Sequence, residues 1–155
     1  MFLSEPPRSP ADITFVLFGV PVRVYPLFWL SGVILNLRGG DDMLGMLLWL
    51  VAFFLSILAH EMGHAMAIRA YGHAPWITLH AFGGLTAHNP TYHYGSRSST
   101  PWAQIQISAA GPLTGFVLAA VILLVIYLTG HEIVRVGPLG MIPLPVGNVV
   151  SPRFT

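Results

Sequence analysis

Residues 60–64 read His-Glu-Met-Gly-His, which puts two imidazoles and a carboxylate within five consecutive positions. Successive residues of an α-helix are about 100° apart, so His60 and His64 project from one face, one turn from each other. Two neutral imidazole nitrogens in that arrangement can bind one Zn²⁺ ion. Glu61 lies near that face, where its carboxylate can take a proton from a zinc-bound water as general base. These are groups that are needed to hydrolyse a peptide bond without a covalent intermediate.

The same residues have less specific interpretations. A His-Glu-x-x-His match arises by chance in about 1% of such sequences, and it can also be the remnant of a former site. Histidines on helices also bind haem, although haem binding does not account for Glu61. The apolar surroundings favour function, because an ionisable side chain at the bilayer centre costs at least about 2.5 kcal/mol. We therefore predict that His60 and His64 are metal ligands and that Glu61 is catalytic.

The composition is that of a membrane protein. Of the 155 residues, 54% are hydrophobic and 8% are charged, whereas a soluble domain carries about 25% charged residues. We predict a mainly α-helical, multi-pass transmembrane bundle with about three spans and a small membrane-associated β element. The net charge of +1 gives no indication of a nucleic-acid partner. The absence of cysteine excludes disulfides and thiolate metal sites.

Two segments that flank the motif have the composition of strands. Residues 13–25 are β-branched and aromatic and predict a strand or hairpin at the membrane surface. Residues 76–87 alternate as a strand does, with Gly83 and Gly84 at the expected turn. This second segment either offers a free strand edge to an unwound substrate or only caps the site.

Two apolar segments are long enough to cross a bilayer as helices. Residues 43–71 carry the motif and are expected to stop at Gly72, and residues 102–128 form the second span. Residues 26–37 are too few to cross alone. Either this first span begins near Val20, or it is a short and tilted helix.

The remaining segments complete the expected organisation. We predict a flexible arm at residues 1–12, a membrane core at residues 13–128 and a loop at residues 88–101. Residues 129–155 read as an irregular Pro/Gly-rich tail, or as a connection to a further helix. With three crossings, and counting arginines within about 20 residues of a span, four fall on the side of the motif's C-terminal end and two on the other. The positive-inside rule then directs the site toward the cytoplasm. The four are Arg8, Arg23, Arg69 and Arg97, and the two are Arg38 and Arg135.

The order of motifs resembles the site-2 protease family of intramembrane metalloproteases. The zinc motif is followed by "AFGGLTAHNP" and then by "AGPLTGF", and "FGVPVRVYP" precedes the first apolar helix. The resemblance runs from about Gly19 to Leu128. It implies that His60 and His64 bind zinc and that Glu61 is the general base. It also implies cleavage of a peptide bond within or near a transmembrane segment of another membrane protein.

Two features of that family's pattern are missing. Its third ligand is an Asp in an N-x-x-P-x-P-x-L-D-G segment, which this sequence lacks, and Gly115 stands where many members have Asn. A catalytic zinc site usually has three protein ligands. We therefore expect the chain to be the N-terminal portion of a longer protein, unless another group is the third ligand or the site is incomplete. The carboxylates other than Glu61 all lie outside the predicted spans, at Glu5, Asp12, Asp41, Asp42 and Glu132.

Four histidines and a Gly-Pro pair are further candidates. The histidines, one of which could substitute as a ligand, are His73, His80, His88 and His93. We single out His80, which lies on a predicted strand, although interfacial or loop roles suit all four. Gly111-Pro112 either interrupts backbone hydrogen bonding near zinc or forms a packing kink in which Ala109, Ala110 and Gly115 admit a neighbouring helix.

These observations lead to two hypotheses about function. The first is an intramembrane zinc endopeptidase, whose partners are the lipid bilayer and a membrane-protein substrate. The second is a non-catalytic membrane subunit or scaffold that keeps the zinc motif without the third ligand.

Overall fold

The computed structural model of the chain describes residues 9–36, 43–81, 83–88, 100–129, 133–136 and 140–143. The chain forms two compact units, and the first of them, residues 1–116, contains the His-Glu-Met-Gly-His motif. In the second, residues 117–155, strands β5 (Ile133–Val136) and β6 (Gly140–Pro143) form an antiparallel hairpin. Within the segment expected to be irregular, these residues form strands because their backbones pair with each other.

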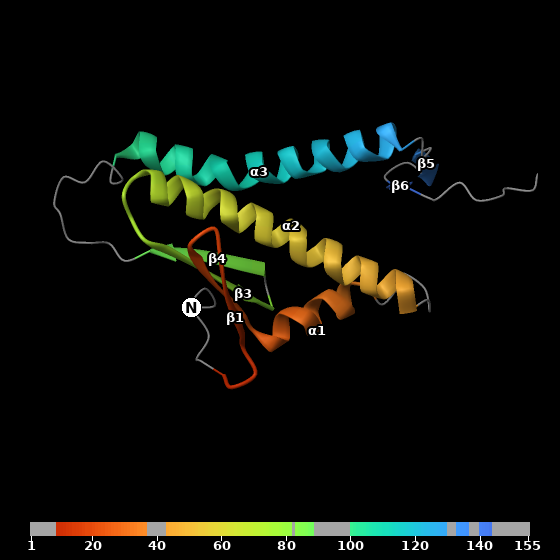
Figure 1. The fold of residues 1–155 in the computed structure, drawn as a ribbon, viewed down its shortest axis with the longest axis horizontal. Coiled ribbons are helices and arrows are strands. Elements are labelled where there is room, and N and C mark those ends of the chain that lie inside the picture. Colours follow the sequence, from red (N-terminus) through yellow and green to blue (C-terminus); the bar gives the residue numbers. More distant parts are fainter. Residues whose placement is uncertain are drawn as a thin grey trace, which may run out of the picture. The chain divides into compact units, whose positions relative to one another are not determined.

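A four-stranded sheet lies along one side of the motif helix α2 (Met43–Ala70), as Figure 1 shows. Its strands, in spatial order, are β1 (Ile13–Leu17), β2 (Val20–Val24), β3 (Pro75–His80) and β4 (Gly83–His88). β2 and β3 pair in parallel, and the two outer pairs are antiparallel hairpins. Strands are thus present in both segments where the sequence predicts them.

The turn of the second hairpin differs from the prediction. Gly83 and Gly84 do not form the turn but begin β4, where they pair with His80 and Leu79. Gly84 lies against α2 at a point where a side chain would overlap Glu61. The glycine at this position is therefore explained by the contact with Glu61 and not by a turn.

Alternation along the strands gives the sheet two different faces. The inner face presents valines of β2, together with Ile77 and Leu79 of β3, to Leu58 and Met62 of α2. Burial of each such aliphatic side chain contributes about 1.5–3 kcal/mol. The outer face carries Arg23 and Thr78, which are register partners on β2 and β3. The buried valines are Val20, Val22 and Val24.

Among the residues that the structure describes, two helices are long and apolar enough to cross a membrane: α2 and α3 (Pro101–Leu128). Only 6% of the residues in the most apolar window of each helix are buried, which distinguishes both from core helices of a soluble protein. α2 ends close to the predicted stop, and Gly72 follows in the left-handed region at φ +85°. The two longest predicted spans are therefore present as helices.

The first predicted span is shorter than expected. Helix α1 (Pro26–Leu35) has ten residues and begins directly after β2. Because residues 20–24 form β2, the span cannot borrow residues from Val20 onward, and the short-helix alternative holds. Aromatic rings of Phe28 and Phe53 stack at 5.0 Å between centroids and pack α1 on α2.

The β1–β2 turn has an unusual backbone conformation. Phe18 and Gly19 both have positive φ, at 48° and 78°. Phe18 has a Cβ, so this left-handed conformation costs about 1–2 kcal/mol. Arg69, in the last turn of α2, donates from Nη1 to the Phe18 carbonyl oxygen at 2.6 Å. This bond attaches the turn to the C-terminal end of α2.

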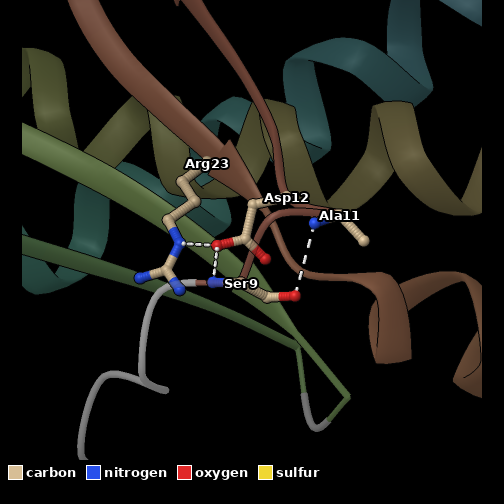
Figure 2. A network of polar contacts seen from close by, with 4 residues as sticks. All are labelled: Ser9, Ala11, Asp12 and Arg23. Carbon is tan, nitrogen blue, oxygen red and sulfur yellow. Dashed lines mark hydrogen bonds and ion pairs between the residues drawn. The ribbon is translucent and has the colours of Figure 1, made fainter.

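The last residues of the predicted arm are attached to the sheet. Figure 2 shows that Asp12 Oδ2 accepts hydrogen bonds from Arg23 Nε at 2.7 Å and from the Ser9 backbone N–H at 2.9 Å. The Ser9 N–H, and then the Arg23 guanidinium, hold the pKa of Asp12 below its usual value of 3.8, although burial opposes them. Asp12 and Arg23 also line a cavity of about 770 Å³ on the sheet.

Candidate metal centre

The two motif histidines converge on one point. Their Nε2 atoms are 3.2 Å apart, and the ring centroids are separated by 4.9 Å. Two nitrogens bound to one tetrahedral zinc at 2.0–2.1 Å lie about 3.3 Å apart. The observed separation of His60 and His64 therefore fits a shared cation, which is the geometry that their i, i+4 spacing predicts.

A carbonyl group of α3 orients the second histidine. His64 Nδ1 lies 2.7 Å from the Ile107 carbonyl oxygen, which can only accept, so Nδ1 carries the proton. The neutral ring then has its lone pair on Nε2, the atom that faces His60. A partner on the far nitrogen is usual for metal-binding histidines, because it fixes both the tautomer and the ring plane.

The approach of α3 to His64 requires a glycine. A Cβ added to Gly111 would overlap the His64 ring around Nε2. The helices therefore pack closely at Gly111 itself, which was not among the small residues expected to admit a neighbour, and the helix continues through Pro112. The expectation for Gly115 is wrong, because a Cβ there would meet nothing within 4 Å. Gly115 lies one helical turn beyond Gly111 on nearly the same face, where no neighbour comes within 4 Å of a Cβ.

The motif carboxylate is buried and oriented by β4. Glu61 is 7% exposed, and its Oε2 accepts a hydrogen bond of 2.6 Å from Thr86 Oγ1. Thr86 Oγ1 also lies 3.0 Å from the Glu61 backbone carbonyl oxygen. A Cβ added to Gly84 would come within 2.6 Å of Glu61 Oε1. Gly84 therefore makes room for one carboxylate oxygen, and Thr86 binds the other.

The other histidines do not join this pair. His80 is buried, but it alternates with Leu79 and therefore lies on the outer face, opposite Gly84 and Thr86. His73 and His88 contact each other at 5.2 Å between ring centroids. Burial, and then the charge of His73, lowers the pKa of His88 from 6.5. His93 lies outside the described residues.

The described part of the chain contains no third ligand for the pair. Among these residues, no three His, Cys, Asp or Glu side chains are grouped as a metal site would require. Asp12 is bound to Arg23 on the sheet. The remaining candidate carboxylates, Glu5, Asp41, Asp42 and Glu132, lie outside the described residues. His60 and His64 thus fit two positions of a zinc site.

The sequence alone did not assign a role in the site to three residues that the structure places there. Thr86 and Gly84 lie on a predicted strand, but nothing local distinguishes them from their neighbours. Ile107 contributes a backbone carbonyl, which any residue possesses. The only available signal was a threonine within the glycine-rich strand "GGLTAH", and it is weak.

Comparison with known proteins gives a consistent set of relatives. The sequence model of the family described as "Peptidase family M50" matches residues 48–146. The chain is 33% identical over 116 residues to "Putative zinc metalloprotease sll0528" of Synechocystis sp., a match that covers 66% of this chain. It is 37% identical over 103 residues to "Putative zinc metalloprotease Rip3" of Mycobacterium tuberculosis, again over 66% of this chain.

A solved structure shares the fold. The chain matches "Site-2 Protease from Methanocaldococcus jannaschii" with a TM-score of 0.53 and 22% sequence identity, over 79% of this chain and 54% of that one. The chain spans only 29% and 20% of the length of the two curated relatives.

Proposed function

This chain belongs to Peptidase family M50, and we propose that it contributes the zinc-binding part of an intramembrane metalloendopeptidase. The protein would hydrolyse peptide bonds within or near transmembrane segments of other membrane proteins. The observation that carries this proposal is the convergence of His60 and His64 Nε2 atoms at 3.2 Å on a candidate membrane span, next to the buried Glu61. The zinc metalloprotease names of the relatives agree with it.

His60 and His64 would hold zinc through Nε2, and a further ligand would come from outside the described residues. When bound, zinc supplies Lewis-acid polarisation of water and of the substrate carbonyl. The protein contributes the orientation: the Ile107 carbonyl keeps the proton of His64 on Nδ1, so that Nε2 stays available.

Glu61 acts in this proposal as the general base. Thr86 occupies Oε2, which leaves Oε1, next to Gly84, as the oxygen that accepts a proton from the attacking water. The same oxygen then delivers that proton to the leaving amine. Proton transfer by a positioned side chain typically contributes about 10²–10⁴-fold to a rate. Water would reach this buried carboxylate through a polar route between the helices.

The substrate backbone would bind along β4. This strand is the last in the order of the sheet, and it pairs with β3 among the described residues. An extended peptide added at its edge would receive backbone hydrogen bonds close to Glu61, because Thr86 of β4 contacts that carboxylate. A helical substrate must unwind there, since a helix keeps its carbonyl groups bonded internally.

We also propose three crossings, with the site toward the cytoplasm. α1 alone is about 15 Å long, about half of the hydrocarbon thickness, so a first crossing over residues 26–37 requires a locally thinned bilayer. The chain has no cysteine, so single cysteines at Pro10 and Met43 can be labelled separately from each side. The two positions flank residues 26–37, so three crossings require that the two labels react from opposite sides of the membrane. Labels that react from the same side would leave two crossings.

Zinc content and cleavage together test the enzymatic proposal. The protein would be purified from membranes, its zinc measured by mass spectrometry, and a reporter containing a transmembrane segment used as substrate. Glu61→Gln should retain zinc and lose about 10²–10⁴-fold in cleavage rate. His60→Ala and His64→Ala should lose both zinc and cleavage. His73→Ala, a histidine outside the pair, is the matched control and should retain both.

A second candidate function is favoured by one observation, namely that the described residues lack a third metal ligand. On this alternative the protein is a non-catalytic membrane subunit or scaffold. Cleavage that Glu61→Gln leaves unchanged would refute the role of the base. Absence of both zinc and cleavage in the unmodified protein would favour the scaffold.

A further inference from the structure

The β1–β2 turn has an exposed apolar tip. Phe18 is 69% exposed and Val16 is 68% exposed. Pro21, the register partner of Val16, is exposed as well. Such turns usually contain Gly, Asn or Asp, which adopt positive φ at low cost and interact well with water. Phe18, at φ 48°, combines a strained backbone with an exposed ring, so an aqueous environment does not account for this residue.

The position of the tip along α2 indicates its surroundings. Arg69 donates from Nη1 to the Phe18 carbonyl oxygen at 2.6 Å, and it lies in the last turn of α2. α2 has 28 residues and is therefore about 42 Å long. This length matches a bilayer including its headgroups, about 40–45 Å. A helix of that length places Arg69 at the level of the headgroups, and the tip bonded to Arg69 lies at the same level.

We propose that Phe18, Val16 and Arg69 form an anchor in the phospholipid interface. The two apolar side chains enter the boundary between headgroups and acyl chains, where aromatic rings are enriched in membrane proteins. The Arg69 guanidinium has five N–H donors, so it can bind lipid phosphate while it donates to the Phe18 carbonyl. Its aliphatic stem remains along the apolar surface.

The anchor fixes the depth of the sheet. β1 and β2 continue through backbone pairing into β3 and β4, and β4 carries the Thr86 that binds Glu61. A tip held at the headgroup level therefore fixes the height of β4 relative to the bilayer. This inference depends on α2 crossing the membrane and not on zinc or cleavage, so it can fail or succeed separately from the proposed function.

Spin-label accessibility measures the depth directly. Because the chain has no cysteine, the variants Phe18→Cys and Leu55→Cys each carry one nitroxide, whose bulk and apolarity resemble those of Phe. The full chain would be reconstituted in vesicles of phosphatidylcholine and phosphatidylglycerol. Collision with oxygen reports the hydrocarbon, and collision with a neutral nickel chelate reports water. Leu55, which is 49% exposed within α2, is the hydrocarbon standard, and the unattached spin label in buffer is the aqueous standard.

The label at position 18 should give an oxygen-to-nickel ratio several-fold above that of the unattached label in buffer and below that at position 55. Adding Arg69→Gln should increase nickel access at position 18 several-fold and leave position 55 unchanged. A ratio at position 18 equal to that of the unattached label would place the tip in water and overturn the anchor. Protection from both reagents would overturn it in favour of a covering protein surface. No response to Arg69→Gln would remove Arg69 from the anchor.

Discussion

Thr86 Oγ1 lies 2.6 Å from Glu61 Oε2, so a hydroxyl group on β4 fixes the carboxylate of α2. The helix alone does not determine the rotation of the Glu61 side chain. The register of β4 on β3 does, because Thr86 pairs with Ile77 and shares its inward face toward α2. The sheet is thus a functional part of the site as well as a packing surface.

Removing the hydroxyl group of Thr86 should impair cleavage while leaving the metal in place. Thr86→Val keeps the shape of the side chain and removes its donor. A hydrogen bond to a charged group contributes about 1.5–3 kcal/mol, so the cleavage rate should fall by about 10–100-fold. Zinc content should stay at the wild-type level. Thr86→Ser, which restores the donor, should recover most of the rate, and equal rates in the Val and Ser variants would contradict the positioning role.

A side chain at Gly111 should disturb His64. The Cβ of Gly111→Ala would overlap the His64 ring, and overpacking of this kind typically costs about 1–3 kcal/mol. We expect lower zinc content and a lower unfolding temperature. Gly115→Ala, four positions along the same helix and with nothing within 4 Å of its Cβ, is the matched control. It should keep the zinc, and its helix should gain slightly in stability. Equal zinc in both variants would show that α3 can move away from His64.

The contact between His73 and His88 should make stability depend on pH. The pKa of His88 is lowered from 6.5 in the folded protein, by burial and then by the charge of His73. The unfolded chain therefore binds this proton more tightly than the folded protein. Stability should be highest above pH 6.5 and should decline as the pH falls through the lowered pKa. His88→Asn should flatten this part of the profile of unfolding temperature against pH, and an unchanged profile would exclude His88 as its origin.

Asp12 should confer acid sensitivity in the same direction, at a lower pH. The Ser9 N–H and Arg23 hold its pKa below 3.8, so this contribution to stability is complete above that pH. It should be lost as the pH falls through the lowered pKa of the folded state. Asp12→Asn should lower the unfolding temperature at neutral pH and remove the acid transition. Amide exchange of residues 9–12 is the direct readout, and unchanged protection in the variant would contradict the attachment shown in Figure 2.

Local pattern was sufficient to predict most of the elements. The long apolar stretches within α2 and α3 predicted helices, because a backbone in lipid must satisfy its own hydrogen bonds. The strands of the first hairpin followed from β-branched residues. The prediction was wrong at Gly83-Gly84, where glycine usually indicates a turn. Gly84 lacks a side chain because one would overlap Glu61. Glu61 belongs to another element, so the local sequence could not show this.

By itself, the sequence determined that His60 and His64 share one face of an apolar helix, with Glu61 beside that face, since their spacing and the helical repeat are both local properties. Only the tertiary structure decided which groups orient them. The Ile107 carbonyl, Thr86 and Gly84 come from α3 and β4, and they meet α2 through strand register and helix packing. These contacts join residues that are far apart along the chain, so no periodicity within one segment encodes them.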